Sequence, residues 1–213
     1  MKYPQILRNT GSLMQFSSGM FLLLILSACA GNPAVQRQQY DFGPTPTPVT
    51  SAPSAQAKTG FQIGLAEVTV PAALDSSAML YRLQYDNVQQ LKAYTLHRWS
   101  MTPADLLSQR LKARLMANGN EVLANTAGAV NLPVLRIDLD EFSQIFSSAS
   151  QSQAQINLRA SVIKAGKLIA QKSFQQQVAA TSADAPGGAR AMQEATDASI
   201  NELQLWLAGL PLK

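Results

Sequence analysis

Residues 153–174 carry the pattern that most restricts the fold of this chain. Small or apolar residues occupy every second position over ten residues: Ala154, Ile156, Leu158, Ala160 and Val162. This two-residue period is typical of a strand with one buried face. Ala165-Gly166 follows as a turn sequence, and Leu168, Ala170 and Phe174 continue the apolar face beyond it. The segment therefore predicts two long antiparallel strands.

Further strands are expected on both sides of a short hairpin. Residues 61–70 are apolar at nearly every position and end at Pro71, which favours a central strand covered on both faces. Residues 79–85 and 91–99 are typical of a hairpin around Asp86-Asn87. Residues 135–140 alternate apolar and charged side chains, and the alternation slips near Glu141, where we expect a β-bulge.

Two segments have helical signals. Thr102 can cap a helix, Pro103 suits its first position, and apolar residues then recur every four positions: Leu107, Leu111 and Leu115. A second helix is expected after residues 184–188 and should stop at Gly209 and Pro211. The predicted fold class is α/β (α+β): a single domain with a mostly antiparallel or mixed sheet of about six or seven strands, packed by two main helices.

The amino terminus has the features of a secretion signal. Residues 1–28 hold no acid and two basic residues, Lys2 and Arg8, and they include the apolar run 20–26. This run is shorter than the ~20 residues that span a bilayer and fits the apolar region of a signal peptide. Without these 28 residues the formal charge falls from +4 to +2 (15 basic against 13 acidic residues), so a nucleic-acid partner is disfavoured.

The signal sequence ends in Leu26-Ser27-Ala28-Cys29, which resembles the lipobox of bacterial lipoproteins. Cys29 is the single cysteine, and in a lipobox its thiol takes a diacylglycerol while the new amino terminus takes a further acyl chain such as palmitate. Ala30 in place of Asp implies, by the same resemblance, sorting to the outer membrane of a Gram-negative bacterium. The alternatives are a chance cysteine after an ordinary signal peptide and a buried thiol.

Residues 29–59 are interpreted as the lipidated cysteine and a tether rich in Pro, Ser and Thr, and residues 60–213 as the folded domain. Within the tether, residues 40–44 form an apolar island with two aromatic side chains, Tyr40 and Phe42. We expect this island to dock on the domain as an edge strand.

The sequence offers little chemistry. It contains no phosphate-binding G-x-x-x-x-G-K-[ST] and no G-x-S-x-G motif. One cysteine and one histidine leave no disulfide framework and no cysteine-rich or histidine-rich metal site. His97 and the pair Asp138/Asp140 are weak candidates for catalysis, and Lys164, Lys167 and Lys172 are best interpreted as a solvated face. We therefore predict no enzyme activity, no cofactor and no metal.

The predicted hairpin 79–99 holds the best candidates for partner binding. Tyr81, Tyr85 and Trp99 share one parity, so they form either the core of the sheet or a docking face, since exposed Tyr, Trp and Arg are enriched in interfaces. Arg82 and Arg98 should face the opposite side. Tyr81, Arg82 and Trp99 are taken as candidate partner-docking residues.

Several short segments occur in an order that is similar to a known family. They are Cys29, Tyr40-Asp41-Phe42-Gly43-Pro44, Val68-Thr69-Val70-Pro71-Ala72, Met79-Leu80-Tyr81-Arg82, His97-Arg98-Trp99, Pro103-Ala104-Asp105-Leu106-Leu107, the run 135–142 with Gln144-Ile145-Phe146, and Leu205-Trp206-Leu207. Together they resemble the auxiliary lipoproteins of ABC-type transport systems, which include the lipoprotein of the paraquat-inducible (Pqi) system. The chain departs from that pattern in the Pro/Thr/Ser-rich stretch between Pro44 and Phe61.

The resemblance implies an accessory protein on the periplasmic side of the outer membrane, with a docking role. Its partners would be a mammalian-cell-entry (MCE) protein and ABC or Pqi-type components of the inner membrane, which move lipids or other hydrophobic molecules. A homo-oligomer around a tubular partner is compatible with this. Two alternatives stay open: a structural lipoprotein of an envelope assembly or secretion complex, and an envelope hydrolase built on His97 or Asp138/Asp140.

Overall fold

The computed structural model describes residues 36–44, 60–123 and 131–212. The described elements belong to one compact unit that begins at Arg37. Cys29 and the predicted signal peptide lie outside the described residues.

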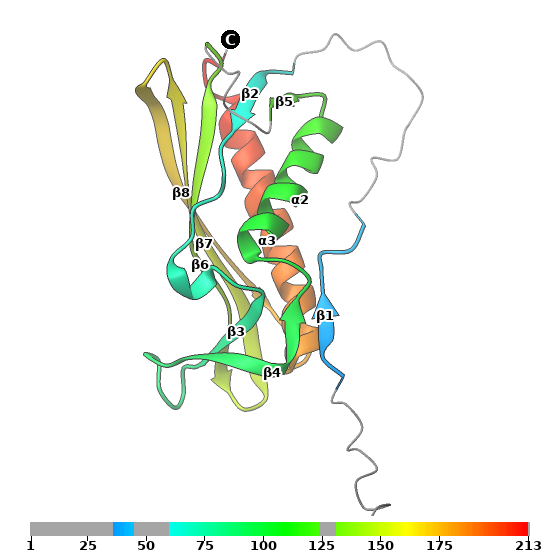
Figure 1. The fold of residues 1–213 in the computed structure, drawn as a ribbon. Helices are drawn as coiled ribbons and strands as arrows, with labels where there is room; N and C mark the ends of the chain where they lie inside the picture. Colours follow the sequence, from blue (N-terminus) through cyan, green and yellow to red (C-terminus); the bar gives the residue numbers. More distant parts are fainter. Residues whose placement is uncertain (1–35, 45–59, 124–130, 213) are drawn as a thin grey trace, which may run out of the picture. The chain divides into compact units, whose positions relative to one another are not determined.

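Eight described strands form one open mixed sheet, and two α-helices cover one of its faces (Figure 1). The strands are β1 (Gln38–Tyr40), β2 (Gln62–Leu65), β3 (Ala78–Leu83), β4 (Leu91–Trp99), β5 (Glu121–Leu123), β6 (Val134–Ser148), β7 (Gln151–Lys164) and β8 (Lys167–Ala179). The helices are α2 (Pro103–Ala117), α3 (Ala185–Ala208) and a short 3-10 helix, η2 (Ala72–Leu74). The predicted α+β class is confirmed; two of the eight strands, β1 and β5, are only three residues long.

Strand β6 organises the sheet. One of its edges pairs with β7 in antiparallel register along almost its full length. Its other edge is shared, because β2 pairs in parallel with the start of β6 (Leu65 opposite Leu135) and β3 pairs in parallel with its end (Tyr81 opposite Gln144). The sheet therefore contains one long antiparallel meander, β6-β7-β8, and two parallel attachments that sequence order alone does not suggest.

The long hairpin follows its predicted pattern with one exception. The five alternating residues from Ala154 to Val162 are at most 3% exposed, and the turn residues Ala165 and Gly166 have φ angles of 49° and 75°. The expected bulge is present between Leu139 and Glu141. Leu168, however, is 59% exposed. Ala170 of β8 pairs with Val162 of β7, and Leu168 pairs with the next residue, Ile163. Strand β8 therefore has one extra residue at this point, and the alternation of buried and exposed side chains ends there.

The predicted strand 61–70 is shorter than expected. Regular pairing covers Gln62–Leu65, where β2 lies between β5 and β6. The chain then continues beside β6 through isolated contacts, including Thr69 N to Ile137 O at 2.9 Å and a bridge between Thr69 and Asp138. The expected central position is confirmed, and the regular strand ends five residues before Val70.

Helix α2 begins where the sequence predicted, whereas α3 begins at Ala185, inside the segment 184–188 after which it was expected, because Asp184 caps it and a proline fits its first turn. The Thr102 hydroxyl accepts a hydrogen bond from Asp105 N at 3.2 Å and donates one to the Asp105 carboxylate at 2.7 Å. Asp184 caps α3 by accepting from Gly187 N at 2.7 Å. Each cap satisfies a donor in the first turn of its helix, which has no partner inside the helix.

Helix α3 packs on β6, β7 and β8, and α2 packs beside α3 and β5. The stripe that the sequence predicted on α2, which ends in Leu111 and Leu115, is fully buried. Gly188 lies in the first turn of α3 so close to Gln144 of β6 that a Cβ atom would overlap its side chain. Glycine at this position therefore lets the helix approach the end of the sheet at which β3 and β4 lie.

Candidate functional site

Five rings from four strands lie in succession near the β3–β4 end of the sheet. The centroid separations are 5.8 Å from Tyr40 to His97, 5.8 Å from His97 to Tyr94, 4.6 Å from Tyr94 to Tyr81, and 5.8 Å from Tyr81 to Phe146. We call these five residues the aromatic row. All except Phe146 are partly exposed, so the row presents ring surface at the edge of the core.

Strand pairing creates the row. The edge strand β1 pairs in parallel with β4, which places Gln38 opposite His97 and brings the Tyr40 hydroxyl within 3.1 Å of His97 Nδ1. The aromatic island does dock on the domain, but the edge strand is Gln38–Tyr40 and includes only Tyr40 of the island, while Phe42 is buried just after the strand ends. Because β1 supplies the first ring, the amino-terminal segment is itself part of this surface.

A hydrogen-bond network around Gln144 holds the middle of the row. The Tyr94 hydroxyl donates to Gln144 Oε1 at 3.0 Å. Gln144 Nε2 donates to Ser152 Oγ at 2.7 Å and to the backbone oxygen of Asp184 at 3.1 Å. Gln144 is 1% exposed, so this satisfied network fixes the rotamers of the side chains around it.

Tyr40 and Tyr94 of the row have raised pKa values and keep their hydroxyl protons. Burial raises the pKa of Tyr94, and the neighbouring Tyr81 and Asp184 raise it further. Burial and then the charge of Asp184 raise the pKa of Tyr40. The hydrogen bonds from Ser182 and Gly187 lower the pKa of Asp184, which keeps its carboxylate charged. The arrangement suits recognition by ring faces, because the hydroxyl protons of Tyr40 and Tyr94 are already donated to Gln38 and Gln144.

The three predicted docking residues are not brought together. Tyr81 lies in the aromatic row, but Arg82 faces the other side of the sheet, where its guanidinium is 3.7 Å from the Glu141 carboxylate. Trp99 is 2% exposed, and its ring contacts Phe42 and Phe142 at centroid distances of 5.9 Å and 5.4 Å. Of its two proposed roles the structure supports the core, because Phe42 of the docked amino-terminal segment covers the indole.

Sequence alternation missed Tyr94 and His97. These residues are three positions apart, so strict alternation would put them on opposite faces of β4. The pairing register of β3 and β4 is irregular: Ala78 lies opposite Arg98, whereas Leu80 lies opposite Ala93. The irregularity changes the parity and lets both rings join the row, with an edge contact between them at an interplanar angle of 83°.

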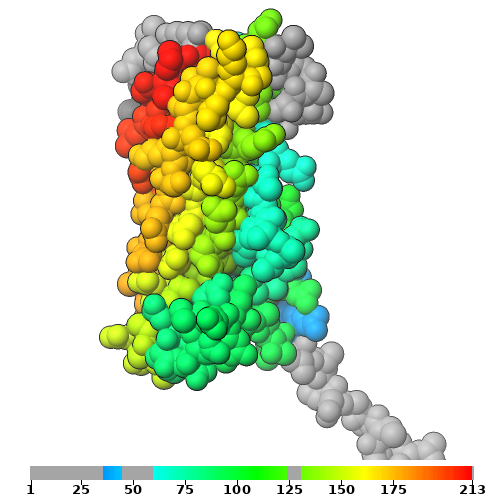
Figure 2. All heavy atoms as spheres, turned by 90° about the vertical axis from the view of Figure 1, so that its left-hand side faces the viewer, coloured from blue at the N-terminus to red at the C-terminus, as the bar shows by residue number. Residues whose placement is uncertain are grey.

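Exposed apolar side chains lie close to the row in the sequence. Tyr85 and Val88, in the connection from β3 to β4, are 53% and 58% exposed, and Leu96 of β4 is 40% exposed. Figure 2 shows the teal and green atoms of β3, β4 and their connection gathered at the lower end of one face. We take the aromatic row and these three residues, its neighbours in the sequence, together as the candidate docking surface.

Three of the other sequence candidates, Asp138, Lys172 and His97, have structural partners. Asp138 is 3.4 Å from the Arg159 guanidinium, Lys172 is 2.9 Å from the Glu202 carboxylate, and His97 contacts Tyr40. Within residues 36–44, 60–123 and 131–212, no three His, Cys, Asp or Glu side chains are grouped to hold a metal. Over the same residues, no helix is long and apolar enough to cross a membrane.

The fold class is shared with solved structures. The protein XCC0632 from Xanthomonas campestris is similar over 84% of this chain and 89% of its own, with a TM-score of 0.61 and 19% identity. A second structure, an uncharacterized protein, covers 81% of this chain and 99% of its own, with a TM-score of 0.61 and 12% identity. At these identities the likeness establishes the fold. No sequence match to a curated protein was found.

The family is established by its sequence model. Residues 40–203 match the model of the ABC-type transport auxiliary lipoprotein component. The chain belongs to this family, as its ordered motifs indicated. The match begins at Tyr40, the first ring of the aromatic row, and includes both helices up to Leu203.

Proposed function

We propose that this protein is an outer-membrane lipoprotein, anchored through acylated Cys29, that faces the periplasm. It serves as the accessory component of an MCE/ABC-type system that moves lipids or other hydrophobic molecules across the envelope. Its role is to dock a partner, and it carries out no catalysis. The observation that carries this proposal is the family match over residues 40–203 behind a lipobox.

The position of β1 supports a close link between anchor and domain. Strand β1 begins at Gln38, nine residues after Cys29. A fully extended chain covers at most about 3.6 Å per residue, so this connection spans about 30 Å at most. A lipid on Cys29 would thus hold the β1–β4 edge near the membrane surface. This connection is shorter than the predicted tether, residues 29–59.

The candidate docking surface supports the role in binding. Tyrosine and tryptophan rings contribute strongly to protein interfaces because they bury a large area with few rotatable bonds. Tyr81 and Tyr94 of the row and the exposed Tyr85 supply such rings. A polypeptide segment of an MCE protein is the occupant that this surface would take.

Site-specific crosslinking in cells tests the docking role. A photoreactive phenylalanine analogue at Tyr85 should capture the MCE protein, because Tyr85 is exposed and its replacement leaves the core intact. The same analogue at Met116, 54% exposed on α2, is the matched control and should capture much less of it. A Cys29→Ala variant should lose acyl labelling and sediment away from outer membranes.

Three results would contradict the proposal in different parts. Capture of only secretion or barrel-assembly proteins would favour the structural alternative. Capture that is equal at Tyr85 and Met116 would reject the docking surface. Acyl labelling that persists in Cys29→Ala would reject the lipidation site. Asp138→Asn should complement a deletion strain fully, and loss of complementation by this variant would support a hydrolase. His97→Ala removes a ring of the aromatic row and should instead lower capture of the partner at Tyr85.

A further inference from the structure

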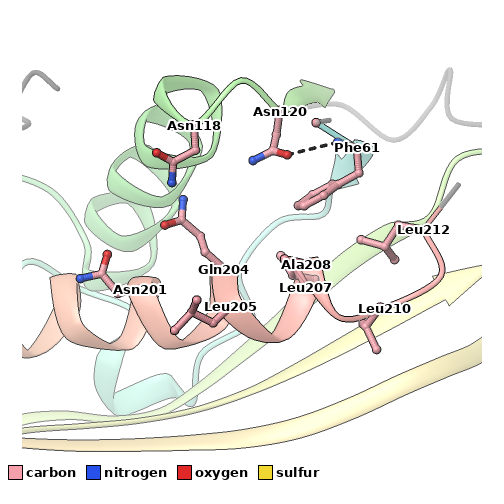
Figure 3. Close-up of a pocket in the computed structure, with 11 residues that line it drawn as sticks. Phe61, Asn118, Asn120, Asn201, Gln204, Leu205, Leu207, Ala208, Leu210 and Leu212 are labelled. Carbon is pink, nitrogen blue, oxygen red and sulfur yellow. Dashed lines mark hydrogen bonds between the residues drawn. The ribbon is translucent and has the colours of Figure 1, made fainter. Parts of the chain in front are cut away.

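A pocket lies at the opposite end of the domain from the docking surface, beside the last turns of α2 and α3 (Figure 3). Its volume is about 610 Å³, within the range of about 300–1,000 Å³ that is usual for small-molecule sites. Eleven described residues line it, and none of them is charged. The lining side chains therefore carry no charge of their own for a phosphate or a carboxylate, although the Arg114 guanidinium is hydrogen-bonded to the lining residue Asn201.

One side of the pocket is formed by side-chain amides. Asn201 Oδ1 accepts a hydrogen bond from the Arg114 guanidinium at 2.8 Å, which leaves Asn201 Nδ2 able to donate. Gln204 Nε2 is buried and has no hydrogen-bond partner among the described residues. Figure 3 shows the amides of Asn118 and Gln204 pointing toward each other across the gap between the helices. This side can therefore donate hydrogen bonds to an uncharged acceptor.

The other side of the pocket is apolar. It consists of Phe61 and of leucines in and after the last turn of α3: Leu207, Leu210 and Leu212. Asn120 holds Phe61 in place, because its Oδ1 accepts from Phe61 N at 3.2 Å while its Nδ2 donates to Leu115 O at 3.1 Å. The aromatic wall is thus fixed by bonds that do not use the free amides of the opposite side.

We propose that this pocket binds one uncharged amphiphile, an acyl chain with an ester, amide or hydroxyl head group. The chain lies along Phe61 and the leucines, where burial of alkyl carbon is favourable. The head group accepts hydrogen bonds from Gln204 and Asn201, whose amides have spare donors. An anionic lipid fits less well, because its charge would be partly desolvated beside residues that carry none.

Photolabelling tests this proposal with the mature lipoprotein in nanodiscs. The probe is a monoacylglycerol with a diazirine in its acyl chain, and the labelled peptides are identified by mass spectrometry. We expect labelling of peptides that contain Phe61 or residues 204–212. Unlabelled monoacylglycerol should abolish this labelling, whereas lysophosphatidylglycerol of the same chain length should compete poorly.

Two variants separate the two sides of the pocket. Ala208→Trp fills the pocket from an exposed position and should abolish labelling without unfolding the domain. Gln204→Leu removes the amide donor and should weaken competition by monoacylglycerol while labelling persists. Leu96→Ser, 40% exposed on β4, is the control and should label like the unmodified chain. Thermal unfolding of each variant checks that it is folded.

Labelling that Ala208→Trp leaves unchanged, or that spreads along the chain, would overturn the proposal. So would equal competition by lysophosphatidylglycerol, because the pocket would then accept an anionic head group. These measurements need neither the transport partner nor crosslinking at Tyr85. A failure here would therefore reject the ligand site and leave the docking function standing.

Discussion

Replacement of Phe42 tests the docking of the amino-terminal segment most directly. Phe42 is 4% exposed, and its ring lies 5.9 Å from Trp99 and 6.3 Å from Phe142. Among residues 36–44 its side chain alone is buried, so it is the one that joins this segment to the core. Phe42→Ala should therefore destabilise the domain although it lies outside the predicted folded range.

The expected loss follows from the cavity that the substitution leaves. Replacing a buried phenylalanine by alanine costs about 3–5 kcal/mol in the free energy of unfolding. The lower end suits this position, because an edge segment can relax more than a central strand. For a domain of this size, about 3 kcal/mol lowers Tm by roughly 6–12 °C, at about 2–4 °C for each kcal/mol.

Thermal unfolding of the purified lipoprotein in one detergent measures this effect. Circular dichroism gives Tm. Tryptophan fluorescence in a Trp206→Phe background follows Trp99, whose emission should shift to longer wavelength when Phe42 no longer covers it. Tyr85→Ala is the matched control, since it removes an aromatic side chain that is 53% exposed. Its Tm should stay within about 1–2 °C, as is usual for surface substitutions.

The result that refutes the reasoning is a Phe42→Ala protein with the same Tm and the same fluorescence as Tyr85→Ala. The amino-terminal segment would then contribute nothing to the core. The aromatic row would lose its first ring, and the short connection from Cys29 to the domain would no longer hold.

Three further predictions concern the interior and the start of α3. Arg110 is 3% exposed and donates to the Asp197 carboxylate at 2.7 Å and 2.9 Å. Arg110→Met should lower the free energy of unfolding by about 3 kcal/mol, and adding Asp197→Leu should restore part of this loss, as measured by a double-mutant cycle of denaturant unfolding. Gly188→Ala should lower stability by about 1–3 kcal/mol, measured the same way, because its Cβ meets the hydrogen-bonded Gln144. Asp184→Asn keeps the helix cap but removes a carboxylate whose pKa is lowered from its ordinary value of 3.8. The wild type should therefore lose stability as pH falls through that lowered pKa, and the variant should lack this part of the acid dependence. Equal stability-against-pH profiles for the two proteins would contradict this.

Local patterns in the sequence predicted most of the secondary structure. The alternation at Ala154–Val162, the turn at Ala165 and the cap at Thr102 depend on neighbours within a few residues, and the structure has all three. The prediction failed at Leu168, where a register shift between β7 and β8 overrides the alternation. Such shifts are properties of two paired strands and leave no mark in the period of one.

The candidate site was only partly accessible from sequence. Tyr81 was found through its parity, whereas Tyr94 was missed because an irregularity between β3 and β4 changes the parity of β4. Trp99 was an open choice between core and surface. Alternation assigns a residue to a face but does not tell which face another segment will cover, and Phe42, 57 residues earlier in the chain, covers this one.

The sequence by itself contains an apolar run, a segment at Cys29 that resembles a lipobox and a Pro-rich stretch, and it predicted the α+β domain. These depend on composition and short spacing. Only the tertiary structure decided which strands share β6, that β1 completes the aromatic row, and that uncharged amides and leucines from the ends of α2 and α3 meet in one pocket. Those contacts join residues far apart in the chain, and their positions follow from packing the whole core, which no local pattern records.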